Sequence, residues 1–491
     1  MSSILLQHAT IIVPATGSDE FSILRDHALL IEGSKITRIA AQIDPPLDTT
    51  EVIDCTGKIV SPGFVDTHHH LWGTQLKGRH ANDTMLDFMF KGVLQSSNFT
   101  ANDVFWGQLG GCLEALDAGT TTVVDHAHAI YSPEHGSNAL SATVSSGIRS
   151  VFCYAPVSRV TGWQPLAFDW EMLPDWLVNQ LEELARGGPY GEGRVNIGLG
   201  FDALYIPKES VVGLFERARA AGVKLITMHY ARGPIFGQFS VVDTLSSYGL
   251  LGPDLLFANA IGASASDAEI MAKEGISISS TPESELQMGL GKPVWNRDDL
   301  KTLSSLGSDS QTVNSTDLLS QMRIALQTER GRINEALLDQ GKAPKKLSVT
   351  VADVFRLATI QGARAIRLQD RIGSLEEGKQ ADIVIFDAQT PAMTCAAEHD
   401  PIAAVVLHAS VRDIETVIVD GHIRKRNGRL TALAVDEAIA GIGKSSVEWK
   451  DVAAQLVRTR ERINAETEKI DYEAAAQAFM AVTGIDSNNL V

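Results

Sequence analysis

Eight short runs rich in β-branched residues recur along the middle of the chain, and longer stretches with apolar residues at helical spacing separate them. This alternation is typical of βα units that build a parallel sheet. Eight such strands are the number that closes a TIM barrel. We therefore predict an α/β fold, a (β/α)8 TIM barrel over residues 59–371. The runs cover residues 57–68, 120–128, 148–157, 194–204, 223–230, 255–262, 276–283 and 303–310.

The two ends of the chain differ from this pattern. Strand-like runs cover 4–13 and 27–40, and further runs follow the barrel at 381–388 and 413–430. The economical interpretation is one small β-sandwich-like domain built from residues 1–58 and 372–430, with the barrel inserted between its halves. Residues 431–491 are charged and alanine-rich, and we predict a helical C-terminal tail that covers the barrel or a partner subunit.

Charge and cysteine usage narrow the classes of partner. The formal net charge is -18, with 60 acidic and 42 basic residues, so phosphate backbones and anionic lipid surfaces would be repelled. The chain has no charge-free run of about 18 apolar residues, which argues against a transmembrane helix. The four cysteines form no CxxC pair, and the amino terminus lacks the basic region of a signal peptide. We expect a cytoplasmic protein with neither nucleic acid nor membrane as partner.

Three consecutive histidines end the first run of the predicted barrel. In an extended strand His68 and His70 face the same side, while His69 faces the other. At the carboxyl end of a barrel strand they would reach the place where active sites of this fold lie. A catalytic metal needs further ligands, and His229 and Asp309 are single polar residues at the tips of two other apolar runs.

Three of these segments carry a family resemblance. The stretches PGFVDTHHHLWGTQLKG, TMHYA and SLGSDS resemble the amidohydrolase superfamily, in its cytosine-deaminase-like and chlorohydrolase-like branch. Residues 358–387 are similar to that branch's passage from the last barrel helix back into the β domain. The motifs match in identity, order and spacing over roughly residues 3–430.

The resemblance implies a site with one divalent transition metal, zinc first, with iron or manganese as alternatives. His68, His70, His229 and Asp309 would hold it. The fourth run has no lysine at its end to bridge two metals, which favours the one-metal arrangement. The metal would activate a water molecule, and Asp309 would act as the base that takes the proton of the water.

The sequence departs from these relatives at two positions. Deaminases of the branch usually read HxxE after the fifth strand, but here Arg232 stands where the glutamate would be. They also usually carry a histidine at the end of the sixth strand, where this chain has Asn259 and Gly262 as the two candidates. No histidine occurs between His229 and His399. Both departures weaken a prediction of ordinary cytosine-like or guanine-like deamination.

Other side chains could supply the missing groups. His126 and His128 end the second run and face one way; family position favours His128 in the pocket, and capping of the following loop is the alternative. Glu283 or Glu285, after the seventh run, could provide the missing carboxylate.

Further candidates concern the substrate. Trp72 and Gln75 could stack on and hydrogen-bond a planar molecule, although Trp72 could equally be core. Arg232 could bind an anionic substrate group or pair with an acidic side chain.

Together these features predict a metal-dependent hydrolase of C–N bonds, of amide, cyclic amide or amidine-like type, in a small cyclic molecule. Metal-activated water is the nucleophile, and His128 or Arg232 helps to stabilise the tetrahedral intermediate. A metal-dependent lyase or isomerase of secondary metabolism and a non-catalytic scaffold are the alternatives. Because relatives are often oligomers, we also expect a homodimer.

Overall fold

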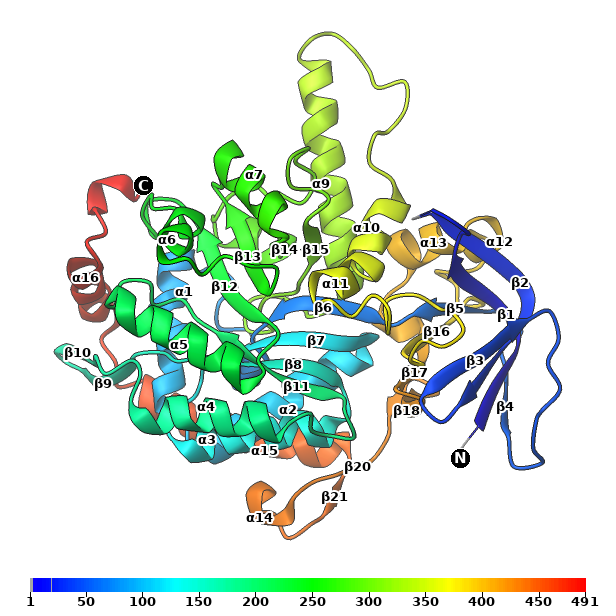
Figure 1. Cartoon of the computed structure of the whole chain (residues 1–491), viewed down its shortest axis with the longest axis horizontal. Helices are drawn as coiled ribbons and strands as arrows, with labels where there is room; N and C mark the ends of the chain where they lie inside the picture. Colours follow the sequence, from blue (N-terminus) through cyan, green and yellow to red (C-terminus); the bar gives the residue numbers. More distant parts are fainter. Residues whose placement is uncertain (1–2, 19) are drawn as a thin grey trace.

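The computed structural model describes residues 3–18 and 20–491, and its centre is a parallel barrel (Figure 1). The strands follow one another in chain order, each pair parallel. A bridge between His69 and Asp309 joins the last strand to the first. The predicted TIM barrel is confirmed. Its strands are β6 (Phe64–His69), β7 (Thr120–Ala127), β8 (Arg149–Tyr154), β11 (Val195–Gly200), β12 (Ile226–Ala231), β13 (Leu255–Ile261), β14 (Ser277–Ser280) and β15 (Ser304–Leu306).

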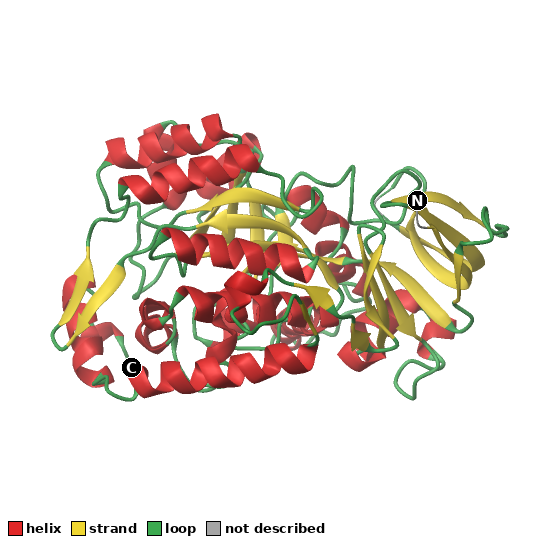
Figure 2. Ribbon diagram, turned by 90° about the horizontal axis from the view of Figure 1, so that it is seen from below, coloured by secondary structure: helices red, strands yellow, loops and turns green. Residues whose placement is uncertain are grey.

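Helices cover the outside of this barrel, as Figure 2 shows. Local sequence signals set their ends: α7 begins with a capping box built by Ser264 and Asp267, and ends at Gly275, which adopts a left-handed conformation with φ 71°. The helices of the βα units are α2 (Ala101–Asp117), α3 (Pro133–Ser146), α4 (Asp175–Gly187), α5 (Lys208–Ala221), α6 (Val241–Tyr248), α7 (Ala265–Glu274), α8 (Pro282–Gln287), α9 (Leu318–Leu338), α10 (Val351–Leu357) and α11 (Ile360–Ala365).

The chain ends on either side of the barrel build one nine-stranded sheet, in the order β19-β18-β17-β16-β5-β1-β2-β3, with β4 paired to β1. The prediction that both ends contribute to one β domain is confirmed. The strands are β1 (Ser3–Pro14), β2 (Phe21–Glu32), β3 (Lys35–Ala40), β4 (Glu51–Asp54), β5 (Lys58–Pro62), β16 (Ile383–Asp387), β17 (Ile414–Val419), β18 (His422–Arg426) and β19 (Arg429–Leu430).

The first predicted barrel run turns out to be two strands. β5 belongs to the nine-stranded sheet, and the chain enters the barrel only after Gly63. A side chain at Gly63 would collide with the side chain of Thr121, so the close passage between the sheets requires glycine. We therefore propose Gly63 as the domain boundary, because a boundary at residue 59 falls inside β5.

A buried ion-pair group fastens the barrel to the accessory sheet. The Arg149 guanidinium, at the start of β8, contacts Asp382 at 2.8 Å and Asp420 at 2.9 Å. Asp382 lies just before β16 and Asp420 just after β17. Burial alone would lower the pKa of Arg149, but the two carboxylates raise it above its usual range. All three groups are buried, so the charges compensate one another without water.

The C-terminal tail lies against the barrel. Helix α15 packs on α2 and on the short 3-10 helix η1 (Leu71–Leu76), and α16 packs on α1 (Met85–Lys91). No helix in the described part of the chain is long and apolar enough to cross a membrane. The tail elements are β20 (Leu433–Ala434), α14 (Glu437–Ala440), β21 (Ser446–Val447), α15 (Trp449–Thr467) and α16 (Tyr472–Thr483).

Candidate metal centre

Three of the predicted ligands converge at the carboxyl end of the barrel. His68 and His70 come from the end of β6, and His229 comes from β12. Their ligand nitrogens all lie within 4.8 Å of one another, and the Nε2 atoms of His70 and His229 are 3.3 Å apart. His69 lies on the opposite side of the strand, with Nε2 2.8 Å from Oε1 of Gln311.

The fourth predicted ligand, Asp309, follows β15 and closes the group. Its Oδ1 lies 3.5 Å from Nε2 of His70 and 3.7 Å from Nε2 of His68. Its backbone N–H donates to the His68 carbonyl oxygen at 2.9 Å, and its own carbonyl oxygen accepts from the His70 N–H at 2.7 Å. Asp309 has φ 65°, a left-handed conformation that is uncommon for a residue other than glycine and often occurs at functional sites. The structure thus brings all four predicted ligands together.

The donor atoms fit a divalent metal. The Nδ1–H of His70 donates to the His126 carbonyl oxygen, and that of His229 donates to Asp202, each at 2.9 Å. This network assigns the protons to Nδ1 and leaves lone pairs on the two facing Nε2 atoms. Two nitrogens bound to one tetrahedral zinc ion lie roughly 3.4 Å apart, close to the 3.3 Å observed.

The environment of His68 also fits a metal ligand. It is fully buried, and neither of its ring nitrogens has a hydrogen-bond partner within the described residues. Burial and the neighbouring histidines hold the pKa of both His68 and His70 well below the usual range. Neutral imidazoles with unpartnered nitrogens are what a zinc site requires.

Asp202 is a functional residue that the sequence analysis missed. It lies just beyond β11, where Oδ1 accepts from the backbone N–H of His229 at 2.8 Å and Oδ2 accepts from its Nδ1–H. Oδ2 also lies 3.3 Å from Nε2 of His126. Burial alone would raise the pKa of Asp202, but the two histidines hold it well below the usual range. A carboxylate that fixes the ring of a metal-binding histidine is a common feature of such sites.

Both histidines at the end of β7 lie next to the ligands. The ring of His126 is 4.9 Å from that of His229, and the ring of His128 is 4.6 Å from that of His70, between centroids. Burial and the nearby histidines lower the pKa of His128 to about 3, so this ring is neutral at physiological pH.

A small cavity adjoins the metal ligands. Trp72 lies on its wall, with its ring centroid 5.2 Å from that of His128 and 5.1 Å from that of Phe99. The wall is largely apolar, and Trp72 is both part of the core and exposed to the cavity. Its lining comprises His70, Trp72, Leu76, Phe88, Gly92, Val93, His128, Ser310 and Thr312.

Gln75, predicted to bind substrate, faces the C-terminal tail instead. Its Nε2 donates to the Asp103 carbonyl oxygen at 2.8 Å and to Oγ1 of Thr459 at 3.1 Å. Gln75 therefore links η1 to α2 and α15. The sequence pattern gave no indication that α15 covers this side of η1.

Arg232 forms an ion pair with an acidic neighbour, which is one of the two roles predicted for it. Its guanidinium lies 3.0 Å from Oδ2 of Asp267 on α7, which also accepts from the Tyr230 hydroxyl at 2.8 Å. A side chain at Gly262 would meet Cβ of Arg232 at 2.8 Å, so glycine at this position makes room for Arg232. The structure shows Arg232 as a structural partner of Asp267.

The two candidate glutamates have different neighbours. Glu283 accepts from Nε2 of Gln321 on α9 at 3.0 Å, away from the metal ligands. Glu285 is fully buried and accepts from the Thr281 N–H at 2.9 Å and from Nδ2 of Asn259 at 3.3 Å. Burial raises the pKa of each carboxyl to about 7. Glu285 thus contacts Asn259, one of the two candidates for the position where relatives usually carry a histidine.

Comparisons with known proteins place the chain among deaminases and hydrolases. A 5'-deoxyadenosine deaminase from Methanobrevibacter smithii is 26% identical, over 92% of this chain and 99% of that protein. A 5-methylthioadenosine/S-adenosylhomocysteine deaminase from Thermococcus onnurineus is 29% identical, over 80% of this chain and 88% of that protein.

Two solved structures share the fold. A zinc-bound atrazine chlorohydrolase from Arthrobacter aurescens has a TM-score of 0.76, 20% identity and coverage of 93% of this chain and 100% of that chain. A zinc-bound adenosine deaminase from Xanthomonas campestris has a TM-score of 0.76, 19% identity and coverage of 94% and 99%. The model of the amidohydrolase family matches residues 59–424. The chain, with its barrel and its cluster of histidines and aspartate, belongs to the amidohydrolase family.

Proposed function

We propose that the protein is a mononuclear zinc hydrolase that cleaves a C–N bond in a small cyclic molecule. The observation that carries the proposal is the preassembled group of His68, His70, His229 and Asp309, with two lone pairs facing each other across 3.3 Å. Zinc held by these residues would lower the pKa of a bound water and polarise the electrophilic carbon of the substrate. The deaminase activities named for the relatives support this reaction class.

Asp309 is the base in this proposal. Its carboxylate lies within 3.7 Å of two ligand nitrogens, where it can accept the proton of the attacking water. Two backbone hydrogen bonds to the end of β6 fix the residue, so the carboxylate does not need to reorganise during the reaction.

The departing nitrogen also needs a proton. Arg232 occupies the usual position of the glutamate that delivers it, and Arg232 is paired with Asp267. We assign this role to Glu285, whose pKa of about 7 lets it hold a proton over part of the neutral range. The charge of Asp309 contributes to the raised pKa of Glu285, which indicates that the two carboxyl groups are close to each other.

The proposed substrate is a planar nitrogen heterocycle. The curated relatives are named for adenosine derivatives, and one structural neighbour is named for atrazine. Trp72 and His128 line the cavity beside His70, although its volume of about 10 Å³ in this conformation is too small for such a molecule. Because the proton donor differs from that of ordinary deaminases, opening of a cyclic amide or amidine is included beside loss of an amine.

The test is a substrate panel with zinc-loaded protein in oxygen-labelled water. The panel contains 5'-deoxyadenosine, 5'-methylthioadenosine and simple cyclic amides, and mass spectrometry follows the products. Incorporation of solvent oxygen into the product supports the hydrolase. This incorporation should be lost in Asp309→Asn and kept in the exposed control Asp298→Asn. Turnover without solvent oxygen would show a lyase or isomerase, and no turnover by fully zinc-loaded protein would favour a scaffold.

We also propose a cytoplasmic homodimer that binds neither nucleic acid nor membrane. The net charge of -18 supports the absence of polyanionic partners. Light scattering after size-exclusion chromatography tests the dimer, and a monomeric mass contradicts it.

A further inference from the structure

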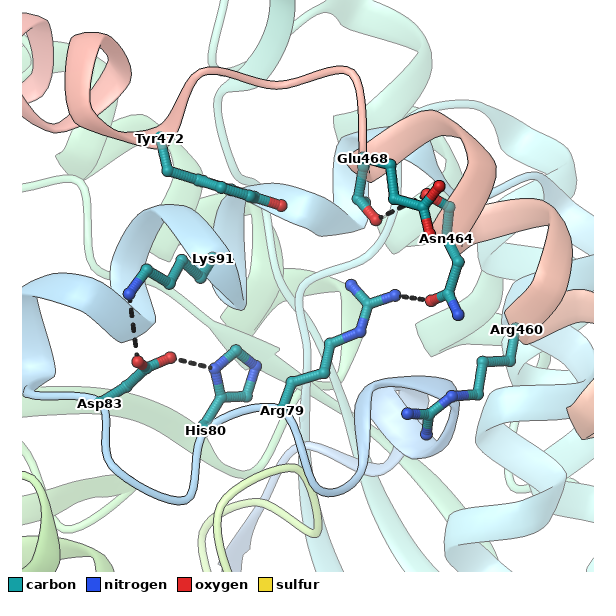
Figure 3. Close-up of a pocket in the computed structure, with 9 residues that line it drawn as sticks. Arg79, His80, Asp83, Lys91, Arg460, Asn464, Glu468 and Tyr472 are labelled. Carbon is teal, nitrogen blue, oxygen red and sulfur yellow. Dashed lines mark hydrogen bonds and ion pairs between the residues drawn. The ribbon is translucent and has the colours of Figure 1, made fainter.

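A second cavity, of about 330 Å³, lies between the segment that follows η1 and the C-terminal helices α15 and α16 (Figure 3). None of its lining residues belongs to the cavity at the metal centre. One wall comes from residues 79–91 and the other from the tail, which are far apart in the sequence. The lining comprises Arg79, His80, Asp83, Lys91, Arg460, Asn464, Thr467, Glu468 and Tyr472.

Two guanidinium groups in this cavity form no ion pair with any of the described residues. Arg79 donates to the amide oxygen of Asn464, and Arg460 donates to the Lys77 carbonyl oxygen at 2.8 Å. Among the residues that the structure describes, no carboxylate lies within the 4 Å of an ion pair from either guanidinium; Glu468 lines the same cavity but is exposed to water. Burial is the main cause that lowers the pKa of Arg79, and the charge of Arg460 adds to it, while Tyr472 and Glu468 partly oppose the shift. Two such neighbouring cations are unusual in a chain with a net charge of -18.

The opposite wall leaves a further polar atom without a partner. Asp83 is already engaged by Nδ1 of His80 at 2.9 Å and by Lys91 at 3.1 Å. His80 is buried, and its Nε2 has no hydrogen-bond partner within the described residues. Figure 3 shows this second ring nitrogen on the side of the ring toward Arg79. Because Nδ1–H donates to Asp83, the neutral His80 ring carries a lone pair on Nε2, so the donors that remain for an anion in this cavity are those of Arg79 and Arg460.

We propose that this cavity binds a small organic anion that carries a carboxylate or a phosphate, with its oxygens between Arg79 and Arg460. Planar guanidinium groups recognise both anions through paired hydrogen bonds. The volume of about 330 Å³ lies at the small end of the range for ligand pockets. The site is new in that it shares no residue with the metal centre and does not depend on the proposed hydrolysis.

The cavity lies next to the segment that also lines the cavity at the metal centre. His80 packs edge to face on Phe88, with ring centroids 5.1 Å apart. Phe88 and the adjacent Gly92 line the cavity beside His70. An anion held between α15 and the segment 79–91 would therefore lie against the segment that forms one wall of the cavity at the metal centre.

The experiment is calorimetric titration of the full-length, zinc-loaded protein with inorganic phosphate and, separately, with succinate. Each titration is repeated with His229→Ala protein, in which binding of an anion to the metal no longer contributes to the measured heat. We expect saturable binding of one or both probes that persists in His229→Ala. Arg79→Gln and Arg460→Gln should each weaken it by about 10-fold or more, because each removes a charge-assisted hydrogen bond. The exposed Arg458→Gln on the same helix is the matched control.

The preference between the probes identifies the anion as a phosphate or a carboxylate. Equal affinity in Arg79→Gln, Arg460→Gln and the unsubstituted protein overturns the proposal, as does the absence of saturable binding by both probes at millimolar concentration. Arg79→Lys keeps the charge and should restore part of the affinity, which separates a lost contact from a damaged fold. Because binding is measured without turnover, a failed hydrolase assay does not affect the result.

Discussion

Asp202→Asn is the sharpest test of how the metal centre is organised. The carboxylate uses one oxygen for the His229 backbone N–H and the other for the Nδ1–H of its ring. An amide has only one oxygen, so one of these two hydrogen bonds is lost and an NH2 group faces a donor. The His229 tautomer with its lone pair on Nε2 is then less favoured, and the affinity for zinc falls.

The structure also sets the size of this effect. Loss of a residue that orients a metal ligand typically weakens metal binding by about 10-fold to 100-fold. The Asp202 side chain is 45% exposed, so water replaces part of the lost hydrogen bond. We therefore expect the lower end, about 10-fold, which corresponds to about 1.4 kcal/mol.

The assay is competition for zinc between the protein and a chelator of known affinity. Asp298→Asn, whose side chain is 98% exposed and pairs only with Lys301 among the ion pairs of the described residues, is the control. Circular dichroism checks that both variants are folded. Unchanged zinc affinity in folded Asp202→Asn would refute the argument that this carboxylate positions His229.

Three further predictions concern other groups. Asp309→Asn should lower kcat by about 10²- to 10⁴-fold in a steady-state assay, since the base is lost; near-normal kcat would remove Asp309 from this role. Arg149→Ala leaves Asp382 and Asp420 buried without a counter-charge and should lower the free energy of unfolding by about 3–5 kcal/mol in urea titrations; a loss below about 1 kcal/mol would contradict this. Arg232→Ala should retain zinc and kcat/KM because the guanidinium pairs with a carboxylate on α7; a raised KM would restore its role in substrate binding.

The barrel and the ligand group could be predicted because they depend on local periodicity. The two-residue repeat of a strand puts His68 and His70 on one side, and the carboxyl ends of parallel strands bring His229 and Asp309 to the same place. The split of the first run at Gly63 could not be predicted, because both parts are equally apolar and only their pairing differs.

The roles of the remaining site residues depend on contacts with residues whose positions in space the sequence does not reveal. Glu283 and Glu285 are two positions apart on α8, so they face different sides of a helix that the sequence analysis did not predict. Gln75 turns to α15, and only the packing of the tail shows this. Asp202 lies within the fourth run, 194–204, but its contact with the site depends on the approach of His229 from the next strand, which the sequence does not show.

The barrel closes at the metal centre itself. β15 has three residues, and beyond it the His69–Asp309 bridge and two backbone hydrogen bonds join the last strand to the end of β6. The proposed ligands lie on both sides of this seam, so a bound ion would cross-link the first and last strands. Ion binding and barrel closure are thus thermodynamically linked, and the melting temperature should rise with the concentration of free zinc. In a protein of this design, a shortage of zinc would therefore lower the stability of the fold as well as the activity.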